Sequence, residues 1–253
     1  MDPKKELSGK VVIITGAARN MGRAFAVHLA QKGANVVIHY HNEKSKADAR
    51  ETAGLVEASG SKAGIFEGDL SNTGLVKKLF AYAMDTFGRV DIVINNAGLV
   101  IKKSFLDITE DDFDRSFGTN ARAAFFVMQE AASVLSDNGR IINMGTTILG
   151  ATIPYYAVYA GAKAPLEDFT RSLAKEIGHR GITVNVVAPG PIDTAFYHGA
   201  ETRQSEERAA QASVAQRLGK VEDIVPVIGF LASPDAQWVT AQTIFVNGGY
   251  LAR

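Results

Sequence analysis

Seven short apolar runs recur along this chain of 253 residues, and a longer segment with helical character separates each run from the next. The runs, rich in Val and Ile, are Val11–Ile14, Val36–Ile38, Ala63–Phe66, Ile92–Ile94, Ile141–Ile142, Ile182–Val187 and Thr243–Val246. Strands that are apolar almost without interruption are typical of a parallel sheet that helices cover on both faces. The alternation of strand and helix therefore predicts an α/β fold with a doubly wound, seven-stranded parallel sheet.

Six helices are expected between these strands, each from its own apolar periodicity. They cover residues 21–32, 44–59, 71–87, 110–136, 158–179 and 221–232. Thr109 and Asp112 resemble a capping box at the start of the fourth helix. Pro165 removes one helical hydrogen bond from the fifth, which predicts a bend or widened turn at 161–165.

No linker or break in composition divides the chain, so residues 1–253 are expected to form a single domain. The polar segment from Asp193 to about Arg217 interrupts the rhythm of strands and helices between the last two strands. Loops of such length in a compact domain are usually functional. We therefore expect a substrate lid at about 193–217.

The composition excludes several classes of function. The net charge is zero and cysteine is absent, so we expect no nucleic-acid partner, no disulfide, no thiolate catalysis and no Cys-ligated zinc. Among the five histidines only His39 and His41 are closely spaced, and contact with a cofactor or exposure to solvent is favoured over metal binding there. Val11–Thr15 is too short for a signal peptide or a membrane span. We expect a soluble cytoplasmic protein with no metal site and no membrane partner.

A glycine-containing turn follows the first strand and leads into a helix. It reads Thr15-Gly16-Ala17-Ala18-Arg19-Asn20-Met21-Gly22. Such a turn lets backbone N–H groups approach a pyrophosphate, to which the helix N-terminus adds favourable partial charge. The position after the first strand of a parallel sheet is that of the phosphate loop in a Rossmann-type fold. A plain tight turn between strand and helix is the alternative.

A tyrosine and a lysine stand four residues apart, at Tyr159 and Lys163, and on a helix they share one face. A phenol titrates near pH ~10, and a neighbouring ammonium lowers that pKa because it favours the phenolate. A lowering by about three pH units needs roughly 4 kcal/mol of differential stabilisation. On its own, such spacing is more often a surface pair, so its meaning depends on the rest of the chain.

Together these motifs resemble the short-chain dehydrogenase/reductase family, over essentially the whole chain and in the same order. The family's phosphate loop is Thr-Gly-x-x-x-Gly-x-Gly, and here Asn20 stands at the middle glycine. Asn is the residue besides glycine that best tolerates a left-handed backbone, so the turn is expected to survive. Further matches are Asp69-Leu70, Asn95-Asn96-Ala97-Gly98, Asn120, Pro189–Thr194 and Val246–Gly249. Within the family, the closest likeness is to the 3-oxoacyl-carrier-protein reductases and their relatives.

The resemblance implies a nicotinamide-dependent oxidoreductase that transfers a hydride between its cofactor and a carbonyl or alcohol. The catalytic residues that it implies are Tyr159, Lys163, Thr146 and Asn120. Tyr159 would exchange the proton, Lys163 would hold the nicotinamide ribose and lower the tyrosine pKa, and Asn120 would hold a relay water. The expected cofactor contacts are Gly16, Arg19, Asn20, Met21, Gly22, Tyr40, His41, Asp69, Leu70, Asn96, Ala97, Gly98, Tyr159, Lys163, Pro189, Gly190, Ile192 and Thr194.

One catalytic position departs from the family, whose serine lies thirteen residues before the tyrosine. That position is Thr146 in this chain. A threonine hydroxyl can still donate a hydrogen bond to the substrate oxygen, although its methyl group narrows the site. We expect Thr146 to act as the donor; the alternative is that it merely ends a strand in an impaired enzyme.

The end of the second strand bears on the choice of cofactor. An acidic residue there would bind the ribose 2′-hydroxyl and select NAD, but the chain has His39-Tyr40-His41-Asn42 and no acid before Glu43. Arg19 lies in the phosphate loop, where a cation could bind a 2′-phosphate. NADP is therefore expected, and NAD is less favoured.

The substrate class is open beyond a small or medium carbonyl or alcohol. Residues expected to border its pocket are Ile148, Leu149, Ile153, Tyr155 and Phe196, and they suggest an apolar or aromatic compound. A non-catalytic dinucleotide sensor is the alternative function, but both Tyr159 and Lys163 are present. The resemblance further implies a homodimer or homotetramer that pairs through the helices at 110–136 and 158–179.

Overall fold

The computed structural model describes residues 5–252, which form a seven-stranded parallel sheet with the strand order β3-β2-β1-β4-β5-β6-β7. The strands are β1 (Val11–Ile14), β2 (Asn35–Tyr40), β3 (Ala63–Glu67), β4 (Ile92–Asn95), β5 (Arg140–Met144), β6 (Thr183–Pro189) and β7 (Thr243–Val246). β1, β4, β5 and β6 are buried along their whole length because helices cover both faces. The predicted fold class, strand number and parallel pairing are confirmed.

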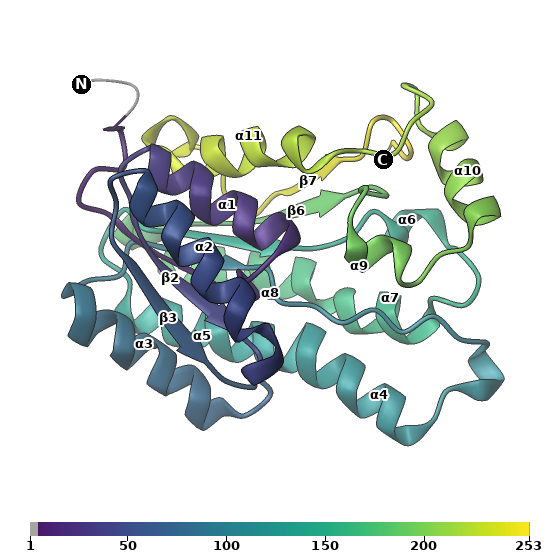
Figure 1. Ribbon diagram of the computed structural model, residues 1–253, viewed down its shortest axis with the longest axis horizontal. Helices are drawn as coiled ribbons and strands as arrows, with labels where there is room; N and C mark the ends of the chain where they lie inside the picture. Colours follow the sequence, from purple (N-terminus) through teal and green to yellow (C-terminus); the bar gives the residue numbers. More distant parts are fainter. Residues whose placement is uncertain (1–4, 253) are drawn as a thin grey trace.

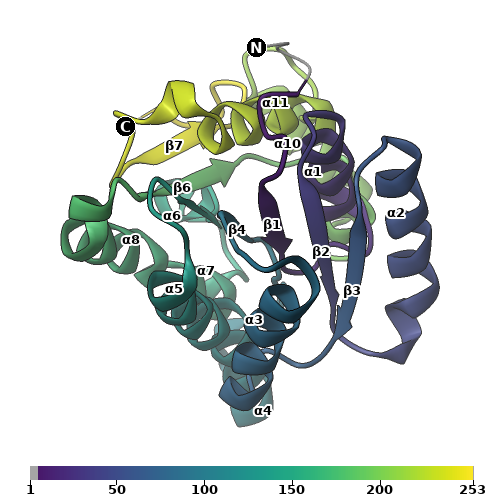
Figure 2. The same cartoon turned by 90° about the vertical axis from the view of Figure 1, so that its left-hand side faces the viewer.

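Helices form a layer on each face of the sheet, as Figure 2 shows for α1, α2 and α11 on one side and α3, α5 and α8 on the other. Their bounds are α1 (Asn20–Gln31), α2 (Lys46–Ala58), α3 (Thr73–Phe87), α4 (Glu110–Phe117), α5 (Ala123–Val134), α8 (Pro165–Ile177) and α11 (Val221–Ala232). The two apolar cores lie between these layers and the sheet. The chain therefore has the doubly wound, Rossmann-type architecture that its alternating pattern predicts.

The helix expected at 110–136 is not one regular α-helix. Thr109 and Asp112 form the predicted capping box at its start, and α4 ends at Phe117. A π-helical turn, Gly118–Arg122, then joins α4 to α5. Single π-turns inside helices are frequent at functional sites, and this one contains Asn120.

The helix expected at 158–179 is divided where Pro165 predicts an irregularity. α7 (Ala157–Lys163) ends before Ala164, and α8 begins with Pro165 in its first turn. Proline has no N–H to donate, so the helical hydrogen-bond pattern is interrupted while Ala164 keeps a right-handed helical backbone. The break lies directly after Lys163.

The polar segment at 193–217 is largely helical, which its sequence did not predict. It forms α9 (Ala195–His198) and α10 (Arg203–Ala212), which lie at the same end of the molecule as the C-terminus (Figure 1). A short helix, α6 (Ile148–Ala151), lies between β5 and α7. Among the described residues, no helix combines the length and apolarity that crossing a bilayer requires.

Candidate active site

The phosphate loop has the conformation that its sequence predicts. Asn20 takes a φ of 51°, in the left-handed region, so asparagine replaces the family's middle glycine without loss of the turn. Gly22 cannot be replaced so easily, since a Cβ there would come 2.4 Å from the carbonyl oxygen of Gly16. The start of α1 is therefore packed directly against the loop.

The N-terminus of α1 suits an anionic group. Arg19, the N-cap residue, makes no capping hydrogen bond with its side chain, and the first turn contains no acidic residue. The first backbone N–H groups of a helix have no partner within the helix and attract phosphate. The Arg19 side chain is 66% exposed, and its ion pair with Asp48 is long, at 4.0 Å. Its guanidinium can therefore also bind an anionic group at the start of α1.

The His39 side chain stabilises the phosphate loop through a hydrogen bond with Gly16. Its ring is buried; Nδ1 accepts a hydrogen bond from the Gly16 N–H (3.1 Å), and Nε2 is 2.8 Å from the Gly68 carbonyl oxygen. Burial lowers the pKa of His39 to about 4, so the ring is neutral and the Nε2–H donates to Gly68. The expectation of cofactor contact or exposure to solvent is wrong for His39, which has a structural role instead.

Of the expected cofactor contacts after β2 and β3, two are exposed and two are buried. His41 and Asp69 are exposed and 3.9 Å apart. Tyr40 is buried and its hydroxyl donates to Glu67, so its side chain belongs to the core and not to a ligand-facing surface. Leu70 is also buried. Neither Tyr40 nor Leu70 can therefore meet a cofactor with a freely accessible side chain.

The Asn95–Gly98 segment ties β4 to the phosphate loop. The Asn95 amide donates to the Ala124 carbonyl oxygen, while the Asn96 amide donates to the carbonyl oxygens of Thr15 and Gly16. The backbone N–H groups of Asn96 and Ala97 both donate to the Thr15 hydroxyl. The segment thus fixes the turn after β1 with side-chain and backbone bonds.

Tyr159 and Lys163 lie on α7, and both are buried. The Lys163 Nζ donates to the Met144 carbonyl oxygen at 2.8 Å. Burial raises the pKa of Tyr159 to about 12, although a hydrogen bond with Thr146 acts in the opposite sense. Burial lowers the pKa of Lys163 to about 8. With a pKa of about 12, Tyr159 is a neutral phenol at neutral pH; the expectation that Lys163 lowers this pKa stays a prediction.

The two neighbouring threonines both line one cavity, but their hydroxyls have different partners. The Thr146 side chain borders the cavity that Tyr159 faces, and it hydrogen-bonds with Tyr159. Thr147 is buried; its hydroxyl donates to the Ala188 carbonyl oxygen (3.1 Å) and accepts from the Asn247 amide (3.3 Å). The geometry therefore supports Thr146 as the expected donor and makes Thr147 a structural residue.

Asn120 lies in the π-helical turn with its side chain buried. Its amide donates to the Leu99 carbonyl oxygen (2.8 Å), and its Oδ1 accepts from the Leu99 N–H (3.1 Å). The side chain positions the segment after β4, next to Gly98 and Lys163. Protein groups therefore engage both N–H groups of the amide, which leaves Oδ1 and the main chain of this turn as acceptors for a relay water.

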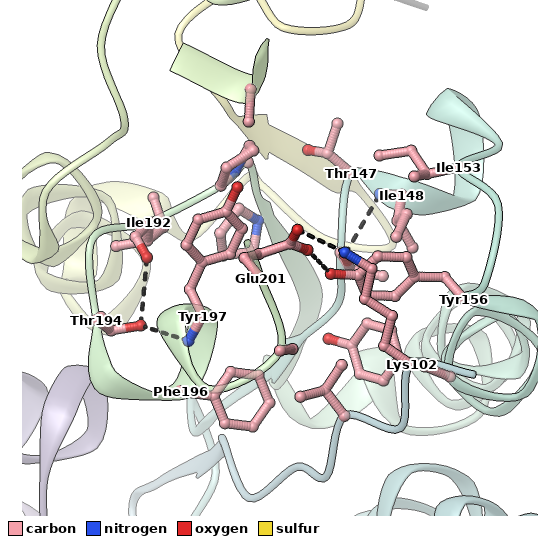
Figure 3. A pocket seen from close by; sticks show the side chains of 18 of the residues that line it. Lys102, Thr147, Ile148, Ile153, Tyr156, Ile192, Thr194, Phe196, Tyr197 and Glu201 are labelled. Atoms are coloured by element: carbon pink, nitrogen blue, oxygen red, sulfur yellow. Dashed lines mark hydrogen bonds and ion pairs between the residues drawn. The ribbon is translucent and has the colours of Figure 1, made fainter. Parts of the chain in front are cut away.

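The side chains of Thr146 and Tyr159 line a cavity of about 330 Å³. Figure 3 shows this cavity with Ile148, Tyr156 and Glu201 on its walls. Its walls also include five of the expected cofactor contacts: Met21, Pro189, Gly190, Ile192 and Thr194. Such a volume is near the lower end of ligand pockets, which are about 300–1,000 Å³. These five residues and the side chains of Thr146 and Tyr159 therefore meet at one cavity beyond the carboxyl ends of β5 and β6.

Three of the five residues expected to border the substrate pocket do so: Ile148, Ile153 and Phe196. Leu149 and Tyr155 instead line a separate hollow, and Tyr155 is 58% exposed. Left-handed backbone at Thr152 (φ 49°) and Tyr155 (φ 71°) accompanies this placement. Leu149 and Tyr155 therefore lie outside the cavity that Thr146 and Tyr159 line.

The sequence did not predict a charged cluster in the cavity, formed by Lys102, Tyr156 and Glu201. Glu201, in the connection between α9 and α10, lies 2.5 Å from the Lys102 Nζ and accepts a hydrogen bond from the Tyr156 hydroxyl. The three residues come from distant parts of the sequence, so no local spacing connects them. Thr202 and Ser205, which form a capping box at α10, are the one local signal that could have located this helix.

No group of three or more histidine and acidic side chains within residues 5–252 could hold a metal ion.

The sequence pattern of the enoyl-(acyl carrier protein) reductase family matches residues 16–251. A hydroxynaphthalene reductase-like protein of Metarhizium majus is 39% identical, over 97% of this chain and 96% of its own. A short-chain type dehydrogenase/reductase of Picea abies is 38% identical, over 96% and 93%. The crystal structure of a putative dehydrogenase of Burkholderia cenocepacia with bound NADP is 42% identical, with a TM-score of 0.95 over 100% of this chain and 97% of its own.

Proposed function

The chain belongs to the short-chain dehydrogenase/reductase family, and on that premise we propose that it is an NADP-dependent reductase of neutral, apolar or aromatic ketones. The observation that carries this proposal is the convergence of the Tyr159 and Thr146 hydroxyls on one cavity beside the buried Lys163. The reverse reaction, oxidation of the corresponding alcohol, uses the same groups.

NADP fits the donors that the chain presents. The free N–H groups at the start of α1 suit the pyrophosphate, and the exposed Arg19 suits the 2′-phosphate. No acidic residue stands at the end of β2 before Glu43 to bind a ribose 2′-hydroxyl. The Burkholderia cenocepacia protein, similar over 97% of its length, has bound NADP.

In the proposed reduction, the substrate carbonyl oxygen lies between Thr146 and Tyr159. Bound NADPH supplies the hydride to the carbonyl carbon. Tyr159, held as a neutral phenol with a pKa of about 12, donates its proton to the oxygen, and Thr146 stabilises the developing negative charge with a hydrogen bond. Because Lys163 uses one donor on Met144, its other N–H groups remain to hold the nicotinamide ribose, and its charge stabilises the phenolate left behind.

The walls of the cavity suggest the substrate. Val100, Ile148, Ile153 and Phe196 give it an apolar surface, which suits an aromatic or alicyclic ketone. The name of the relative at 39% identity, a hydroxynaphthalene reductase-like protein, also favours an aromatic substrate. The segment at 193–217 contributes Phe196 and Glu201 to the cavity, and we assign it the role of a substrate lid.

A screen of ketones with NADPH and NADH, followed by absorbance of the reduced nicotinamide, tests the proposal. We expect turnover of bicyclic aromatic ketones with NADPH, and much less with NADH. A protein that binds NADPH but reduces no ketone would instead be the dinucleotide sensor. The presence of both Tyr159 and Lys163 in the site argues against that alternative.

A further inference from the structure

The Lys102–Glu201 ion pair lies inside the candidate substrate cavity, where the proposed reaction does not use it. Figure 3 shows the Glu201 carboxylate joined by dashed lines to the Lys102 amine and the Tyr156 hydroxyl. Lys102 follows β4, Tyr156 precedes α7, and Glu201 comes from the lid. The cavity thus has a charged cluster built from three separate segments.

These charges are costly to place there. The side chain of Glu201 is 5% exposed and that of Lys102 is 20% exposed. Removing a charge from water is unfavourable unless a partner and hydrogen bonds compensate it. Burial acts to raise the pKa of Glu201, but hydrogen bonds from Lys102, Ser205 and Tyr156 outweigh it, so the pKa lies below its ordinary value. The carboxyl is therefore ionised, and its charge compensates that of the Lys102 ammonium.

Lys102 retains hydrogen-bonding capacity toward the cavity. An ammonium has three N–H donors, and among the described residues only Glu201 accepts a hydrogen bond from the Lys102 Nζ. The ammonium also lies 5.2 Å from the centre of the Tyr156 ring, within range of a cation–π contact. Two N–H groups therefore remain for a ligand in the cavity.

The cluster is close to the reacting groups. The rings of Tyr156 and Tyr159 are 6.1 Å apart between centroids, and both side chains line the same cavity. A molecule whose carbonyl reaches Tyr159 can therefore bring a substituent a few bonds away to Lys102. Around the cluster the walls are apolar, at Val100, Ile153 and Phe196.

We propose that the Lys102–Glu201 pair determines substrate specificity: Lys102 binds an oxygen substituent of a neutral ketone, and Glu201 supplies the carboxylate that an acidic substrate would otherwise bring. The pocket then selects oxygenated neutral ketones over both plain hydrocarbons and carboxylic acids. This inference rests on the proposed ketone reductase function. If the pair only held the lid segment in place, its removal would lower the activity toward all substrates by the same factor.

The test compares three kinds of bicyclic ketone with NADPH: a tetralone, its positional hydroxy derivatives and a carboxytetralone. The quantity measured is the ratio of kcat/KM between substrates, from which any overall loss of activity cancels. We expect the wild type to favour the best hydroxytetralone and to disfavour the acid. Failure of the wild type to reduce any of the three would contradict the proposed function itself, which distinguishes that failure from an error about this pair.

Lys102→Met should lower the hydroxytetralone-to-tetralone ratio about 10- to 100-fold, the scale of one charge-assisted hydrogen bond. Glu201→Gln should raise the carboxytetralone-to-tetralone ratio by about tenfold or more, because it leaves Lys102 as an uncompensated cation. Lys103→Met and Glu207→Gln remove the same charges outside the cavity, where these residues pair with Asp112 and Arg203. These controls should leave both ratios unchanged.

A variant that leaves one charge buried can fail to fold. The double variant Lys102→Met/Glu201→Gln removes both charges, so it keeps the test decisive. It should lose the preference for hydroxytetralone and gain none for the acid. Equal loss for every substrate in all three variants, with unchanged ratios, would overturn the proposal and leave the pair as a fastening of the lid.

Discussion

Thr146 and Thr147 are adjacent in the chain, yet replacement by alanine should lower kcat at Thr146 and the stability of the fold at Thr147. Thr146→Ala removes the donor to the substrate oxygen, so we expect kcat to fall about 100-fold, the usual loss for one donor to a developing oxyanion. Such a loss equals about 2.7 kcal/mol of transition-state stabilisation. The free energy of unfolding should change by less than about 1 kcal/mol, because Thr146 is only partly buried.

Thr147→Ala should act on stability instead. Its hydroxyl bonds the Ala188 carbonyl oxygen and the Asn247 amide inside the protein, and both would lose that partner. A buried polar group left unsatisfied costs about 1–3 kcal/mol. For 253 residues, the corresponding fall in Tm is about 2–6 °C, if unfolding entropy has its ordinary value per residue. The kcat should fall far less than in Thr146→Ala.

Steady-state kinetics and thermal unfolding of the two variants, measured side by side, separate the roles. Thr146→Ser and Thr147→Ser are the matched controls, since each keeps the hydroxyl and should retain both properties. A crippling kcat effect in Thr147→Ala with a mild one in Thr146→Ala would refute the assignment. If neither change lowered kcat, the substrate oxygen would be held by Tyr159 alone.

Three other expectations are open to direct measurement. Arg19→Ala should weaken NADPH binding by roughly 1.5–3 kcal/mol and NADH binding hardly at all; equal losses in a fluorescence titration would remove Arg19 from the 2′-phosphate site. Burial lowers the pKa of His39 to about 4 in the folded protein, whereas an unfolded histidine titrates near 6.5. As the pH falls from about 6.5 to 4, the unfolded chain therefore takes up a proton at His39 that the folded chain does not. His39 should thus cost the fold ~3 kcal/mol of stability in that window, and denaturant titrations of His39→Gln should lack this decline; an unchanged acid slope would show that His39 does not titrate this way. Light scattering should give two or four times 27.0 kDa if α4, α5 and α8 form two-fold interfaces, whereas a monomer mass at every concentration would exclude them.

Local sequence signals were sufficient wherever the chemistry of one short segment fixes its conformation. The left-handed Asn20 is one such case, and the division of the helix before Pro165 is another. The buried strands are a third, because their apolar runs determine both their position and their parallel pairing. The pairing of Thr146 with Tyr159 was implied by the family resemblance, in which a serine lies thirteen residues before the tyrosine.

What the sequence did not reveal depends on contacts between distant segments. Glu201 meets Lys102 across 99 residues, and nothing near either residue announces the pair. Tyr155 and Tyr156 are neighbours, yet only Tyr156 lines the candidate cavity, whereas Tyr155, with a left-handed backbone, is 58% exposed. His39 is polar at a strand end, yet it is buried because two backbone groups of other segments satisfy its ring.

The central claim is that Tyr159 protonates a ketone oxygen while a hydride reaches the carbonyl carbon. NADPH deuterated at the transferable C4 position, incubated with a bicyclic aromatic ketone, tests it through mass spectrometry of the alcohol formed. The wild type should yield alcohol with deuterium on the carbinol carbon. Tyr159→Phe should yield almost none, even though it binds NADPH with nearly unchanged affinity. Unlabelled alcohol from the wild type, or undiminished labelled product from Tyr159→Phe, would contradict the account.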